Sequence, residues 1–258
     1  MLCPKCRMEQ DDRNLLCDYC GQVFRRAGLE GPIVGSVPVD PRFTVYAPAG
    51  TAASSWLLTR LFTPMPGSSR LALAGRAALL LLLAAWGARL WAFSPESNGA
   101  GRSLLHLVNL PFHEAGHVLF APFGDFVRVL GGTLAQFLMP LVCCLVLLFK
   151  TRDPFGAGAA LWWFGENFLD IAPYMDDAGT GELPLLGGNT GESTPYGFHD
   201  WEYLLTESGH LGHEHELART AHVLGVIVMA VAILWMAYVL VRAWRAEGES
   251  RKVRGRYL

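Results

Sequence analysis

Long apolar stretches dominate this chain and restrict it to folds that suit a membrane. Hydrophobic residues make up 52% of its 258 positions and charged residues 17%. The excess is gathered into runs of about 20 residues, the length that a helix needs to cross a bilayer. We therefore expect a mainly α fold, a polytopic membrane helical bundle of four to five spans. The runs are 71–93, 103–122, 127–149, 155–176 and 218–242.

A small metal-binding segment is expected before the first apolar run. Cys3 and Cys6, and then Cys17 and Cys20, form two C-x-x-C pairs within residues 1–24. Two such pairs converge into a tetrahedral site of four thiolates that suits one structural zinc ion. The alternative is a pair of disulfides, which requires an oxidising compartment. The stretch resembles the zinc ribbons at the ends of many bacterial membrane proteins, which implies a structural or partner-docking role.

The rest of the chain divides by composition. Its N-terminus does not have the pattern of a cleavable signal peptide, so internal apolar segments are expected to direct insertion. The net charge of −2 and the lack of a basic stripe with interleaved aromatics argue against nucleic acid as a partner. The expected order is a zinc ribbon, a linker with a short interfacial helix near 56–66, a membrane domain and a basic tail: 1–24, 25–70, 71–242 and 243–258.

The second apolar run contains the pattern H-E-x-x-H. On a helix, His113 and His117 lie four residues apart on one face, so both imidazoles can bind one zinc ion. Glu114 lies beside them and can take a proton from a zinc-bound water. The alternative is a helix whose histidines only form hydrogen bonds with neighbouring helices. A catalytic zinc site needs three protein ligands and one open position, so a third ligand must come from elsewhere.

The same run has a continuous polar face. His106, Asn109, His113 and His117 follow one another at steps of three and four residues within 103–122. Polar side chains are costly against lipid, so this face should point into the bundle or into a wet cavity.

The third ligand is expected near the end of the fourth run. Several carboxylates gather there beside Pro173, which can break the helix and aim an acidic side chain. The candidates include Asp170, Asp176 and Asp177, together with Glu166.

These two elements together resemble the site-2-protease-like intramembrane zinc metalloproteases. That family combines H-E-x-x-H with a later Asn…Pro…Leu-Asp-Gly element whose aspartate is a ligand. Here Asn167, Pro173 and Asp176 match that order. Asp177 stands where the family has glycine, and one residue is inserted. The resemblance covers roughly residues 103–177 and implies His113, His117 and Asp176 as ligands of a catalytic zinc, with Asp170 and Asp177 as alternatives.

The resemblance also implies a function. Glu114 would act as general base, and Asn167 would hold the substrate backbone or the oxyanion. The substrate would be a membrane-embedded or membrane-adjacent protein segment with locally unwound helix. The alternative function is a non-catalytic zinc-binding scaffold, a pseudoprotease that acts through partner binding.

A polar loop, 177–217, contains further histidines and no Lys or Arg. The sequence His199-Asp200-Trp201 could fold back over the zinc as a substrate binder or lid. A third interpretation is a membrane enzyme that acts on soluble substrates through this loop, with His199, His210, His213 and His215.

Charge favours a bacterial inner-membrane protein with its zinc ribbon and C-terminal tail in the cytoplasm, because basic flanks remain inside. Five complete spans would place the two termini on opposite sides. The conflict disappears if 103–122 is short or re-entrant, whereas the family resemblance favours a full crossing of that segment.

Overall fold

The computed structural model of the chain describes residues 52–65 and 69–254. These residues belong to one compact unit. The predicted zinc ribbon lies outside the described residues, as does most of the predicted linker. The expected ligands that lie there are Cys3, Cys6, Cys17 and Cys20.

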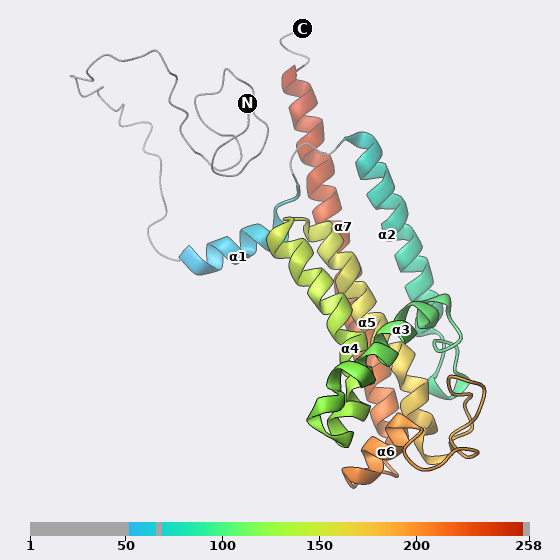
Figure 1. Cartoon of the computed structure of the whole chain (residues 1–258). Coiled ribbons are helices and arrows are strands. Elements are labelled where there is room, and N and C mark those ends of the chain that lie inside the picture. The colour runs from blue at the N-terminus through green and yellow to red at the C-terminus, as the bar shows by residue number, and fades with distance from the viewer. Residues whose placement is uncertain (1–51, 66–68, 255–258) are drawn as a thin grey trace, which may run out of the picture. The chain divides into compact units, whose positions relative to one another are not determined.

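Helices make up almost all of the regular structure, and the described residues contain no strand (Figure 1). The mainly α prediction is therefore confirmed. A π-helical turn, Val146–Lys150, continues α4 without a break. The α-helices are α1 (Ala52–Phe62), α2 (Arg70–Trp91), α3 (Leu104–Phe120), α4 (Asp125–Leu145), α5 (Pro154–Asp176), α6 (Asp200–Glu207) and α7 (Glu214–Arg254).

Three of these helices are long and apolar enough to cross a membrane. They are α2, α4 with its π-helical turn, and the Glu214–Gly248 part of α7. Their large apolar side chains are widely exposed; Leu81 and Leu234 are each 70% accessible. A soluble protein rarely exposes so much contiguous apolar surface, whereas lipid covers it at no cost. The membrane class is thus supported, with three of the four to five expected spans.

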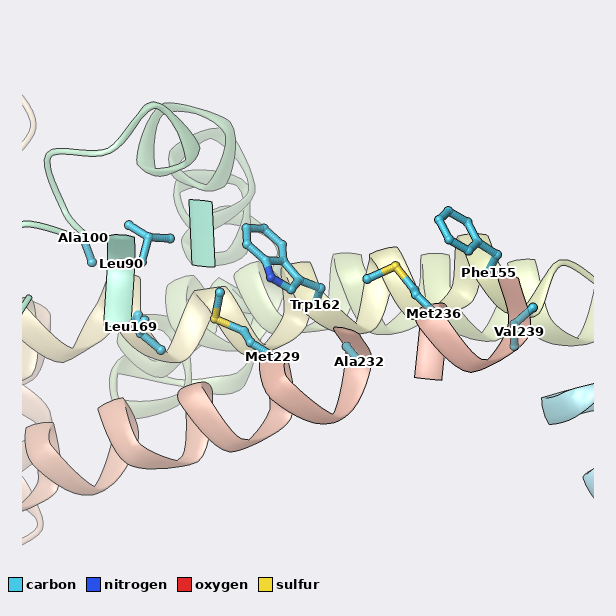
Figure 2. Close-up of a cluster of buried hydrophobic side chains, with 9 residues drawn as sticks. All are labelled: Leu90, Ala100, Phe155, Trp162, Leu169, Met229, Ala232, Met236 and Val239. Atoms are coloured by element: carbon cyan, nitrogen blue, oxygen red, sulfur yellow. The ribbon is translucent and has the colours of Figure 1, made fainter. Parts of the chain in front are cut away.

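The central pair of the bundle is α5 and α7, which lie side by side and antiparallel (Figure 1). Their contact depends on glycines. A Cβ on Gly165 would lie 2.8 Å from the Cγ atom of Met229, and one on Gly158 would lie 2.5 Å from that of Met236. Met229 and Met236 fill the space beside these glycines. Both belong, with Trp162, to the buried cluster of Figure 2.

The other long helices pack around this pair with alternating direction. The start of α2 lies near the end of α7, since Arg70 and Glu247 form an ion pair at 3.5 Å. Past the other end of α2, Glu96 pairs with Arg219 near the start of α7, at 3.1 Å. We call the end where α2 and α5 finish and α4 and α7 begin the site end, and the opposite end the tail end.

Helix α3 differs from the others because it remains at the site end. It connects the last turns of α2 to the first turn of α4 and packs closely against α4. A Cβ on Gly116 would lie only 2.1 Å from the carbonyl oxygen of Gly131, so no larger residue fits this crossing. This close approach at Gly131 fixes the H-E-x-x-H helix against α4.

Candidate metal centre

Two histidines and one aspartate converge at the site end. His113 and His117 project from one face of α3, and Asp200 is the first residue of α6. The Nε2 atoms of His113 and His117 lie 2.8 and 3.2 Å from the same carboxylate oxygen, Oδ2 of Asp200. One potential ligand atom from each residue lies within 4.8 Å of the other two, so the group could hold a metal ion.

The hydrogen bond made by Nδ1 of each ring bears on whether Nε2 of that ring carries a proton. The Nδ1 atom of His113 lies 3.1 Å from the side-chain oxygen of Gln136, and that of His117 lies 3.0 Å from the carbonyl oxygen of Arg128. Both partners only accept hydrogen bonds, so both Nδ1 atoms carry protons. In a neutral ring Nε2 then presents a lone pair to Asp200. Three electron-pair donors facing one another are the arrangement that a cation stabilises.

The spacing suits a small tetrahedral ion. With zinc–ligand bonds of about 2.0–2.1 Å, two tetrahedral ligand atoms lie about 3.3 Å apart. The two nitrogen–oxygen distances at Asp200, 2.8 and 3.2 Å, are somewhat shorter than that value and close to it, respectively. Two imidazoles and one carboxylate leave a fourth position open, which is the composition of a catalytic zinc site.

A glycine of α4 leaves the space for these ligands. A Cβ on Gly132 would lie 2.6 Å from Nε2 of His117 and 2.7 Å from Nε2 of His113. Any side chain at this position would occupy the point where the two ligand nitrogens meet.

Asp200 is held in place by its neighbours. His199 is the N-cap of α6, with its Nδ1 atom accepting from the backbone N–H of Glu202 at 3.1 Å. The backbone N–H of Asp200 donates to the hydroxyl oxygen of Tyr174 at 2.9 Å. Burial lowers the pKa of His199, more than nearby Asp177 raises it, which favours the neutral ring that the cap requires.

The charge of Asp200 suits a metal ligand. Burial alone would raise its pKa. When the two histidine rings are protonated at both nitrogens, however, their Nε2 atoms donate to Asp200, and these hydrogen bonds and charge interactions outweigh burial and lower the pKa of Asp200. The side chain is therefore an anion at neutral pH.

The aspartates that the sequence favoured as third ligand lie elsewhere. Asp176, the first choice, lies 2.7 Å from Nδ1 of His215 and joins the end of α5 to the start of α7. Asp177 accepts from the backbone N–H groups of Glu182 and Leu183, at 2.8 and 3.0 Å, and so anchors the following loop.

Asp170 and Asn167 are also outside the histidine–aspartate group. Asp170 accepts from Asn109 and Gln136, at 3.0 and 2.8 Å. Asn167 is fully buried and donates to the carbonyl of Trp163 at 2.9 Å. It does not line the cavity beside the histidines, so the oxyanion role expected for it has no geometric support.

The predicted polar face of α3 does point into the bundle. Nδ1 of His106 lies 3.0 Å from Asp170, and the amide of Asn109 donates to Glu166 and Asp170 at 3.0 Å each. The expectation that this face points into the bundle is confirmed.

A cavity of about 710 Å³ opens beside the three candidate ligands. Glu114 and Tyr174 line it, and so does the loop on its far side, including Leu186 and Phe198. Within the described part of the chain, the Glu114 carboxylate makes no hydrogen bond. An unpaired carboxylate next to two candidate ligands is free to act on a bound water.

The histidines of the loop do not form a second group of this kind among the described residues. His210 lies 3.2 Å from the Ser208 hydroxyl, and His213 pairs with Glu216 at 3.6 Å. Asp200, the candidate third ligand that sequence reasoning did not name, lies in the His199-Asp200-Trp201 segment that was considered as one that could fold back over a zinc ion. The only local signal was an aspartate directly after a helix-capping position.

A scan against models of protein families, a search of curated proteins and a search of solved structures each found no match. What this site does is therefore inferred from its own geometry.

Proposed function

We propose that the chain is a membrane-embedded zinc metallopeptidase that cleaves membrane or membrane-adjacent protein segments. His113, His117 and Asp200 are the proposed zinc ligands, and Glu114 is the general base. One observation carries the proposal. The Nε2 atoms of His113 and His117 meet one carboxylate oxygen of Asp200, and Glu114 lines the open cavity beside them.

The side chains present can perform amide hydrolysis. A zinc ion held there supplies a Lewis acid and lowers the pKa of a bound water. Glu114 takes the proton of the attacking water and delivers it to the leaving amine. The hydroxyl oxygen of Tyr174 already accepts a hydrogen bond from Asp200, so its own proton remains available to the substrate's carbonyl oxygen.

The lining of the cavity suits an apolar peptide. Leu110 and Ile171 contribute from the helices, and Leu183, Leu185 and Phe198 from the loop. Apolar walls with a few convergent polar groups are usual for binding sites. An extended peptide segment is favoured because attack on an amide requires its backbone to be free of helical hydrogen bonds.

The proposed topology has four crossings, by α2, α4, α5 and α7, while α3 enters the membrane only from the site end. Both ends of this membrane domain are then on one side, which removes the conflict between the charges of the two termini. Basic residues near the tail end favour the cytoplasm for that end, whereas residues 153–218 contain no Lys or Arg. The basic residues are Arg70, Lys150, Arg152, Arg242 and Arg245.

Replacement of Glu114 by Gln tests the proposal. The amide cannot accept the proton of the attacking water, so turnover should fall by about 10²- to 10⁴-fold while zinc remains bound. Membrane fractions of cells that express either form would be compared by labelling of protein N-termini. Cleavage products should be present with the unsubstituted protein and absent with E114Q.

The control is Glu192→Gln, which removes an exposed carboxylate from the loop and should leave the products unchanged. Identical sets of N-termini from E114Q and the unsubstituted protein, with zinc bound in both, would favour the non-catalytic scaffold instead.

A further inference from the structure

A buried amide links one candidate ligand to a carboxylate that does not itself reach the metal site. Gln136 of α4 is 3% exposed. Its side-chain oxygen lies 3.1 Å from Nδ1 of His113, and its side-chain nitrogen donates to Oδ2 of Asp170 at 2.8 Å. It therefore joins α3 to α5 directly behind the first histidine.

We propose that Gln136, oriented by Asp170, is a positioning residue that keeps the proton of His113 on Nδ1 and leaves Nε2 free to bind the metal. The proposal rests on the metal centre proposed for His113, His117 and Asp200, and deepens it. Asp170, which was expected as an alternative ligand, would orient Gln136 instead of binding the ion itself.

The orientation of Gln136 follows from what each partner can do. The NH₂ group of Gln136 faces Asp170, because it donates to Oδ2 of that side chain. The amide oxygen then faces His113 and can only accept. His113 is therefore forced to donate from Nδ1, and the nitrogen nearer Asp200 becomes the ligand.

Hydrogen bonds from neighbouring side chains hold Asp170 in place, and the orientation of Asn109 among them follows from its other partner. The indole N–H of Trp163 donates to the side-chain oxygen of Asn109 at 2.8 Å. Because indole is a donor only, the NH₂ group of Asn109 must point the other way, towards Glu166 and Asp170. His106 completes the set at 3.0 Å from the other oxygen of Asp170. The proton position on His113 is thus set by a chain of buried groups from three helices.

The two histidines differ in this respect. His117 donates to a main-chain carbonyl, that of Arg128, which no side-chain substitution removes. The orientation of His113 depends on one side chain, so His113 is the ligand whose binding can be weakened without touching the site itself.

Replacement of Gln136 by Met tests the inference, because Met has a similar size but neither donates nor accepts strongly. Loss of such a partner costs about 10- to 100-fold in metal affinity. The matched control is Thr133→Val, which removes another buried polar atom of α4, one without a hydrogen-bond partner. Zinc affinity would be measured on the full chain in detergent micelles by competition with a chromophoric chelator. Thr133→Val should bind zinc as tightly as the unsubstituted chain.

Two further measurements complete the test. Gln136→Glu should restore zinc affinity to within about threefold, since a carboxyl group with one proton on the oxygen facing Asp170 reproduces both bonds. ¹⁵N NMR of the zinc-loaded, unsubstituted protein should show His113 protonated at Nδ1 and bound through Nε2. This second readout decides the matter even if Gln136→Met does not fold.

The outcomes separate this inference from the proposal on which it rests. Unchanged affinity in Gln136→Met, or zinc on Nδ1 of His113, would overturn the positioning role alone. If His113→Ala binds as much zinc as the unsubstituted chain, the metal centre itself is absent and both ideas fail.

Discussion

Three side chains from two distant parts of the chain form the proposed centre, and their identities were only partly readable from the sequence. His113 and His117 are close because one helical turn separates them, so a local pattern was sufficient to find them. Asp200 is 87 residues from His113 along the chain. Its position depends on how the loop after α5 closes, which no local spacing encodes. The aspartates of the family-like element were closer in sequence, but Asp176 and Asp177 have other partners.

Replacement of each aspartate in turn should therefore show whether Asp200 or Asp176 is the third zinc ligand. Asp200→Ala should lower bound zinc by about one ion per chain, because two imidazoles alone hold the ion weakly. Asp176→Asn should retain it, since that carboxylate faces His215. Zinc per chain, measured by elemental analysis after gel filtration, checks this. If Asp176→Asn lost the ion and Asp200→Ala kept it, the ligand assignment would be reversed.

At the scale of helices, the apolar runs predicted the positions of the long helices well. Each long helix lies over one of the expected runs, because hydrophobic length is a local property. Whether a helix crosses completely depends on its neighbours. Helix α3 remains at the site end because its glycine crossing with α4 and the polar bonds of its inner face hold it there. The polar face could be read from the sequence of α3, but the partners that it meets and the glycine crossing with α4 could not.

A larger residue in the glycine contact between α5 and α7 should lower the stability of the protein. A leucine at Gly165 would need the space of Met229, whose Cγ lies 2.8 Å from the ideal Cβ position. Overpacking of this kind costs about 1–3 kcal/mol, so the thermal midpoint in detergent should fall. Gly248→Leu, in α7 but with nothing within 4 Å of its ideal Cβ, is the control and should change it little. Equal midpoints for the two variants would mean that this seam is not closely packed.

For the whole molecule, the proposed four-crossing topology predicts which loops share a side of the membrane. Cysteines introduced at Ser97 and Asp125, before and after α3, should react with an impermeant maleimide from the outside of intact cells. A cysteine at Thr151, at the tail end, should react only after permeabilisation. Peptide mapping by mass spectrometry would distinguish these cysteines from the native ones. Labelling of the Ser97 and Asp125 variants from opposite sides would show that α3 crosses completely.

If α3 enters the membrane only from the site end, as the proposed topology has it, its depth has a consequence for where such an enzyme would cleave. A reactive centre carried by a helix that enters from one surface lies at a fixed depth below that surface. If the chain is a peptidase, bonds would then be broken within the outermost turns of a client's span rather than at its midpoint. The choice of bond would then depend more on its distance from the water boundary than on the identity of the residues on either side.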